Sequence, residues 1–95
     1  MKTNQNNKAT HPGERLKNEL EERNIRLEDF FKQIGMPQQE LKEFMRGKRE
    51  VTVELAEALA GQFGIPATTW LKMQEEYNQV VAERNAAVTL LLLNV

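Results

Sequence analysis

The sequence contains no cysteine and a single histidine, His11. Without cysteine the chain can form neither a disulfide nor a thiolate site, and one imidazole alone cannot supply a transition-metal site. We therefore expect no metal and no cofactor. A chain without cysteine also fits the reducing conditions of the cytoplasm.

Long apolar runs are missing as well. No stretch approaches the roughly 18–20 apolar residues that are needed to cross a bilayer. The first residues also lack the apolar segment of a secretory signal. We expect a cytoplasmic protein without a membrane partner.

Two further absences argue against an enzyme. The chain has 95 residues, a single-domain length that leaves little room for an enclosed active site. It has no glycine-rich loop of the kind that holds phosphates. We expect no catalytic residues and interpret the many glutamates as solvated side chains on helix faces.

The charge is nearly balanced overall, with a formal value of −1, but it is unevenly distributed. Residues 23–49 hold seven basic and four acidic side chains, whereas residues 50–95 hold two basic and six acidic ones. This asymmetry predicts one face for an anionic partner and another face for a different partner.

Apolar residues recur at helical spacing, and no stretch alternates strictly with a period of two. Leu27, Phe30, Phe31 and Ile34, for example, repeat as the apolar stripe of an amphipathic helix does. We predict an all-α fold of five helices with a long last helix, at about residues 12–23, 27–34, 38–45, 53–63 and from 67 onward.

The composition also suggests the limits of the domain. Residues 1–10 are polar and aperiodic, which predicts a flexible N-terminal tail. Residues 11–88 form the predicted domain, and residues 89–95 form an apolar C-terminal tail.

Two short helices joined by a turn that contains Gly35 are typical of a helix-turn-helix. We expect four apolar residues to hold the two helices together: Phe30, Ile34, Leu41 and Phe44. The polar side of the second helix would then project outward and could enter the major groove of DNA.

Seven side chains are candidates for contact with DNA. Gln38, Gln39 and Lys42 lie outward on the second helix, where Gln can pair with adenine and Lys can donate to guanine. The candidates for phosphate contacts are Arg26, Arg46, Lys48 and Arg49. The alternative for both groups is that they are ordinary solvated side chains.

The last residues include four consecutive leucines, Leu90, Leu91, Leu92 and Leu93, which cannot all face one side of a helix. A soluble chain rarely leaves such a patch uncovered. We predict that these leucines contact a second subunit; a different partner protein and a frayed end are the alternatives.

Several stretches, in this order and spacing, resemble the HigA-type antitoxins of the XRE, lambda-repressor-like helix-turn-helix superfamily: HPGERLKNEL, residues 25–35, RGKREVT, AEALAGQFG and WLKMQEEYNQVVAE. The resemblance spans about residues 11–83. It implies a five-helix domain that forms a homodimer and binds a palindromic operator in double-stranded DNA. It also implies repression of the chain's own operon and neutralisation of a co-encoded HigB-like toxin, an mRNA-cleaving ribonuclease.

The sequence departs from this family in its helix-turn-helix. Arg26 and Leu27 stand where the family commonly has a Ser cap and a Gln that contacts DNA, and Phe31 replaces a small residue. Glu40 and Glu43 would each weaken binding if they faced phosphates. Two other functions therefore remain open, a stand-alone XRE-type regulator and a protein-interaction module with weakened DNA binding.

Overall fold

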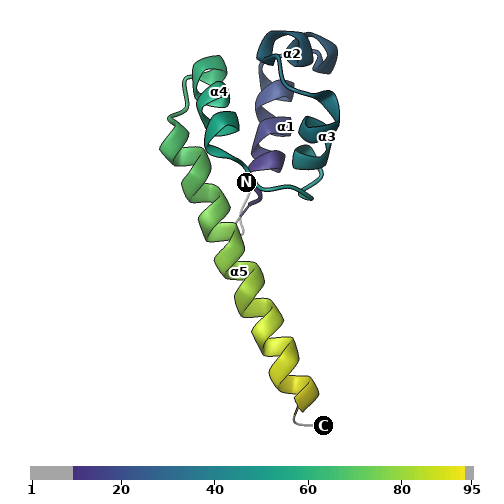
Figure 1. Cartoon of the computed structure of the whole chain (residues 1–95), viewed down its shortest axis with the longest axis vertical. Coiled ribbons are helices and arrows are strands. Elements are labelled where there is room, and N and C mark those ends of the chain that lie inside the picture. The colour runs from purple at the N-terminus through teal and green to yellow at the C-terminus, as the bar shows by residue number, and fades with distance from the viewer. Residues whose placement is uncertain (1–9, 94–95) are drawn as a thin grey trace.

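The computed structural model describes residues 10–93, and within them it contains five α-helices and no strand. The helices are α1 (Pro12–Glu22), α2 (Leu27–Ile34), α3 (Gln38–Met45), α4 (Val53–Phe63) and α5 (Ala67–Leu93). Helices α1 to α4 form one group that packs against the first half of α5 mainly through α4, and the second half of α5 extends away from this group (Figure 1). The predicted all-α, five-helix fold is confirmed.

The helix boundaries follow from local capping. The Thr52 side chain accepts a hydrogen bond of 3.1 Å from the Leu55 N–H at the start of α4. Gly35 ends α2 with a φ of 68°, a left-handed conformation that glycine adopts without steric cost. Asn24, with a φ of 55°, follows α1 in the same conformation. Thr52 thus begins α4, Gly35 ends α2 and Asn24 follows the end of α1, each within one residue of the boundary that the sequence predicts.

The core is a single cluster to which all five helices contribute. Trp70 of α5 is fully buried, and its ring lies 6.5 Å from that of Phe63, which in turn stacks on Phe30 at 5.9 Å. This aromatic chain joins α5 to α4 and α4 to α2. The other large side chains that are fully buried are Pro12, Leu16, Phe30, Leu41, Phe44 and Leu59.

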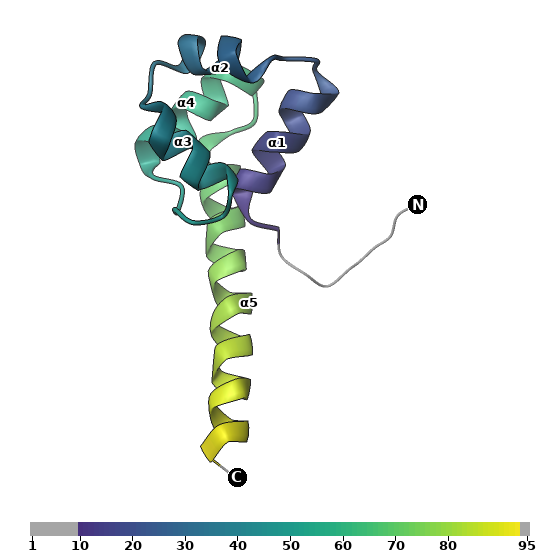
Figure 2. The same cartoon turned by 90° about the vertical axis from the view of Figure 1, so that its right-hand side faces the viewer.

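Helices α1 and α3 approach each other at Gly13. A Cβ atom at this position would lie 1.9 Å from the carbonyl oxygen of Phe44 and 3.0 Å from the Cα of Met45. Both are backbone atoms, which cannot rotate aside as a side chain would. Glycine at position 13 is therefore required for α3 to lie as close to α1 as it does (Figure 2).

Helix α5 continues through the predicted C-terminal tail. Leu90 to Leu93 belong to the same helix as Trp70, so the expected boundary between residues 88 and 89 falls inside a helix. Every residue from 82 to 93 is exposed, the four leucines by 61–75%. The predicted tail at residues 1–10 lies outside the described residues apart from Thr10, and so do Asn94 and Val95.

Leu27 differs from its predicted place in the apolar stripe of α2. Phe30 and Phe31 are buried and Ile34 is half-buried, but Leu27 is 39% exposed. It is the first residue of α2, and at the edge of the domain it faces a surface groove instead of the core. The apolar periodicity therefore placed Leu27 on the correct side of α2, but it overestimated how far the side chain is buried.

The two helical positions Gly13 and Gly61 predict opposite responses to alanine. Gly13→Ala forces backbone atoms apart and should lower the free energy of unfolding by about 1–3 kcal/mol. Gly61 lies inside α4 with nothing within 4 Å of its added Cβ, so Gly61→Ala should raise it by roughly 0.5–1 kcal/mol. Urea unfolding of both variants tests this, and equal effects would contradict the close approach at Gly13.

Candidate nucleic-acid interface

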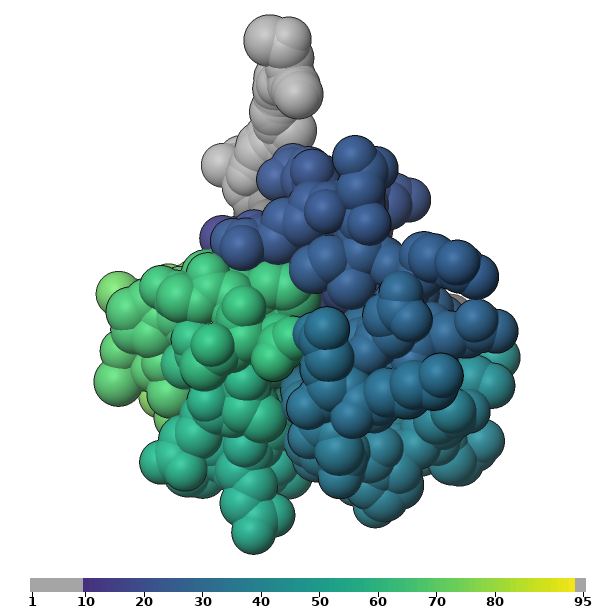
Figure 3. Space-filling view, turned by 90° about the horizontal axis from the view of Figure 1, so that it is seen from above, coloured from purple at the N-terminus to yellow at the C-terminus, as the bar shows by residue number. Residues whose placement is uncertain are grey.

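The outer side of α3 is polar and exposed. Leu41 and Phe44 on its inner side are fully buried, whereas Gln38, Gln39 and Lys42 are exposed. The residues of α2 and α3 cover one half of the surface seen in Figure 3, next to α4. The predicted inward seam is present, with Ile34 half-buried at its edge, and it turns the three candidate base-contacting residues toward solvent.

Glu43 holds two of the candidate side chains. Its carboxylate accepts a hydrogen bond of 2.7 Å from Arg49 Nη2 and one of 3.2 Å from Gln39 Nε2. The hydrogen bond from Arg49, and secondarily that from Gln39, lowers the pKa of Glu43, and the same contact raises the pKa of Arg49. The negative charge of Glu43 is thus largely offset by Arg49, and a DNA ligand has to compete with Glu43 for both side chains.

The remaining phosphate candidates lie at both ends of the helix-turn-helix. Arg46 is the exposed C-cap of α3, and Lys48 is exposed in the loop that follows. Arg26 is the N-cap of α2, and its Nη2 lies 3.6 Å from Glu28 Oε1 between two highly exposed side chains. Such a contact is worth little in water, so Arg26 is available to another anion.

The loop between α3 and α4 is fixed to α5 by polar side chains that the sequence analysis did not single out. Buried Gln74 accepts a hydrogen bond of 2.9 Å from the Val51 N–H and donates one of 3.0 Å to Asn78. Asn78 donates to Glu50 at 3.3 Å. The signal available in the sequence was spacing, because Gln74 follows Trp70 by one helical turn.

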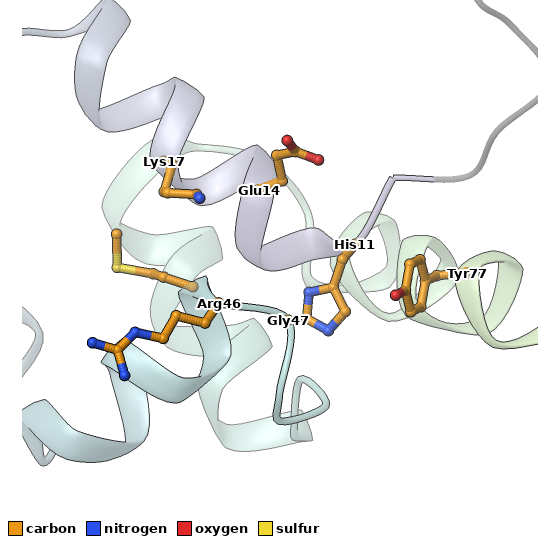
Figure 4. A pocket seen from close by; sticks show the side chains of 7 residues that line it. His11, Glu14, Lys17, Arg46, Gly47 and Tyr77 are labelled. Atoms are coloured by element: carbon orange, nitrogen blue, oxygen red, sulfur yellow. The ribbon is translucent and has the colours of Figure 1, made fainter. Parts of the chain in front are cut away.

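His11 is the N-cap of α1, and its Nδ1 accepts a hydrogen bond of 2.9 Å from the Gly13 N–H. Its ring is buried between Phe44, at 5.6 Å, and Tyr77, which it meets edge-on at 4.9 Å. Figure 4 shows His11 beside Tyr77 and close to Gly47, and all three line one pocket. The predicted first helix at about residues 12–23 leaves His11 directly before its start, but its contacts with α3 and α5 depend on tertiary packing that the sequence does not indicate.

Within residues 10–93, no group of three or more His, Cys, Asp and Glu side chains is arranged to hold a metal ion. None of the helices in that range combines the length and the apolarity that crossing a bilayer requires.

Comparison with known proteins bears on the fold and the family. A family model described as helix-turn-helix matches residues 16–70, more than half of the chain. The chain belongs to the helix-turn-helix family. The virulence-associated protein I of Dichelobacter nodosus is 32% identical over 78 residues, which are 81% of this chain and 72% of that protein.

Solved helix-turn-helix structures resemble the whole described domain. A Nostoc punctiforme protein assigned to the antidotes of plasmid maintenance systems gives a TM-score of 0.85 at 24% identity, over 93% of this chain and 97% of its own. An addiction module antidote of the HigA family from Coxiella burnetii gives 0.77 at 26%, over 86% and 90%. Pseudomonas aeruginosa antitoxin HigA, solved with the higBA promoter, gives 0.77 at 24%, over 87% and 91%. The predicted resemblance to HigA-type antitoxins is confirmed.

The histidine cap predicts a loss of stability in mild acid. Burial lowers the pKa of His11 below its ordinary 6.5, although the Arg49 backbone and the carboxylates of Glu50 and Glu14 oppose the shift. The folded state therefore favours neutral His11, so its contribution is present above pH 6.5 and is lost as the pH falls toward the folded pKa.

The matched variant is His11→Asn, because asparagine also caps a helix but does not titrate near neutral pH. We expect the free energy of unfolding to fall between about pH 7 and pH 5 in the wild type and to fall less in His11→Asn. Parallel pH profiles of the two proteins would show that His11 is not the titrating group.

Proposed function

We propose that this chain is a sequence-specific DNA-binding antitoxin that represses its own operon and neutralises a co-encoded HigB-like, mRNA-cleaving toxin. The observation that carries the DNA-binding part is the polar outer side of α3, which stands opposite a fully buried Leu41 and Phe44. An eight-residue helix held in this way can enter the major groove without disturbing the core.

The proposal assigns different tasks to the two groups of side chains. Gln38, Gln39 and Lys42 read base edges, because amide and ammonium groups match the hydrogen-bonding pattern of the major groove. The remaining four position the domain on the phosphates and carry no sequence information: Arg26, Arg46, Lys48 and Arg49.

We further propose that the protein acts as a homodimer on a palindromic operator. Two copies related by a twofold axis would present two α3 helices to half-sites about one helical turn apart. The exposed second half of α5, with Leu90 to Leu93 at its end, is the proposed contact, because exposed leucines on all sides of a helix gain from burial against another helix.

The toxin-neutralising role rests on the families of the structural neighbours and on charge. Residues 50–95 carry an excess of acidic side chains, which suits a basic ribonuclease, and they lie mainly outside the helix-turn-helix. Both the toxin and its antitoxin would meet in the cytoplasm, where mRNA is available.

Two other functions are the alternatives to this proposal. A stand-alone regulator would keep the DNA contacts without a toxin, and a ribonuclease-like reading frame beside the gene distinguishes the two. A protein-interaction module is favoured by Glu43, whose carboxylate engages two of the candidate DNA-contacting side chains, Gln39 and Arg49. Measuring whether the wild type binds its own upstream region at all separates this last function from the first two.

The double variant Gln38→Ala/Gln39→Ala tests base reading. On a duplex from the region upstream of the gene, we expect affinity to fall by at least about tenfold, since each base pair read in this way is worth about 1–3 kcal/mol. Affinity for a scrambled duplex should be unchanged. Gln79→Ala, an exposed glutamine on α5, is the control. Equal binding of the upstream duplex by double variant and wild type would refute base reading.

A chain that ends after Ala87 tests the proposed dimer contact. The full chain should have the mass of a dimer in sedimentation equilibrium, and the shortened chain should have the mass of a monomer. Because every residue from 82 to 93 is exposed, the removed segment covers no core residue, and helix content per residue in α1 to α4 should be retained. A shortened chain that is still a dimer would place the contact elsewhere.

A further inference from the structure

A groove of about 250 Å³ lies between α1, the start of α2 and the end of α3. It is called the basic groove below, and it is lined by Lys17, Leu27, Lys42, Met45 and Arg46. Lys17 comes from α1, Leu27 opens α2, and the other three belong to α3 or follow it directly. Lys17 is not among the DNA-contacting residues proposed above.

The three cations of the basic groove have no carboxylate partner in the part of the chain that is described. The four ion pairs found between residues 10 and 93 use Arg15, Arg23, Arg26 and Arg49 as their cations. Glu14 and Glu21 line two hollows that adjoin the groove, but neither lines the groove itself. The groove thus concentrates positive charge that nothing within it neutralises.

Lys17 and Arg46 also line the neighbouring pocket of Figure 4. There they lie on the same side of the pocket, and Tyr77 lies on the opposite side. A lysine of α1 is therefore brought beside the end of α3 although 29 positions of sequence separate it from Arg46. The close approach of the two helices at Gly13 makes this neighbourhood possible.

The groove combines these cations with apolar side chains. Leu27 is 39% exposed and Met45 is half-buried, and neither can donate a hydrogen bond from its side chain. A sugar–phosphate strand has the complementary chemistry, because its phosphates need cationic donors and the carbons of its deoxyriboses can lie on apolar side chains. A purely acidic partner would leave the apolar part unmatched.

We propose that the basic groove holds the backbone of one DNA strand along the edge of α3, and that Lys17 is a phosphate contact supplied by α1. This inference rests on the proposed DNA-binding function and deepens it. Lys42 and Arg46 belong both to the groove and to the proposed interface, so the groove continues that interface toward α1.

The first experiment compares Lys17→Gln with Lys72→Gln, an equal change of charge at an exposed position of α5. Binding to the upstream duplex and to a scrambled duplex is measured between about 50 and about 200 mM salt. We expect Lys17→Gln to reduce the slope of log affinity against log salt by about 0.9 and to weaken both duplexes alike, because phosphates carry no sequence. Lys72→Gln should match the wild type, and Lys17→Arg should restore the slope.

A second pair of variants compares a charged with an uncharged polar side chain at Leu27, in the apolar part of the groove. Leu27→Glu puts an anion at the first position of α2, where it favours the helix, so the protein should remain folded. Its affinity for both duplexes should fall by about tenfold or more at low salt, whereas uncharged Leu27→Gln, which loses only part of the apolar contact, should lose much less.

The outcomes separate this inference from the function on which it rests. A wild type that binds neither duplex would overturn both. If the wild type binds DNA but each pair of variants has equal affinity, only the basic groove is overturned. Equal affinity here means that Lys17→Gln binds as Lys72→Gln does and that Leu27→Glu binds as Leu27→Gln does. Weakening confined to the upstream duplex would also overturn it, because it would make Lys17 a base contact.

Discussion

The close approach of α1 to the end of α3 sets the position of every side chain on the outer face of α3. Eight residues are too few to form a stable helix alone, so α3 depends on neighbours for its existence and its direction. Gly13 lets the α1 backbone contact the Phe44 carbonyl, while Leu41 and Phe44 are buried in the core. The same contact brings Lys17 to the rim of the basic groove and His11 to the ring of Phe44.

A second set of interactions is polar and controls the loop after α3. Gln74 on α5 accepts from the Val51 N–H, and Glu43 on α3 holds Arg49. The loop that carries Lys48 and Arg49 is therefore tied both to α3 and to the helix proposed to contact a second subunit. Rigid placement favours a phosphate contact because little side-chain entropy is then lost on binding. The hydrogen bond from Arg49 to Glu43 has the opposite effect, because it must be broken or shared before Arg49 can bind a phosphate. The balance of these two effects sets how tightly the domain binds DNA.

Local signals in the sequence were enough for the helices, because apolar spacing and caps such as Thr52 and Gly35 act within a few residues. They also located the outward side of α3, since that side follows from its buried residues. Features that depend on contacts between distant segments could not be predicted from the sequence. Glycine is needed at position 13 because of Phe44, which lies 31 positions further along the chain. The exposure of Leu27 depends on where the domain ends. The burial of Gln74 was not evident because the residues that follow it, Glu75 and Glu76, are also polar. The four leucines at the end stood out in the sequence. That they belong to α5, and not to a separate tail, follows only from a helix that runs unbroken from Ala67 to Leu93.

The central claim is that DNA binds against α3 and the loop that follows it. Hydrogen–deuterium exchange of the full chain, with and without the upstream duplex, tests it most directly because every backbone amide reports separately. The account predicts slower exchange at the start of α2 and in residues 38–49, with no change in residues 82–93. Slower exchange confined to the second half of α5, with residues 38–49 unchanged, would contradict it.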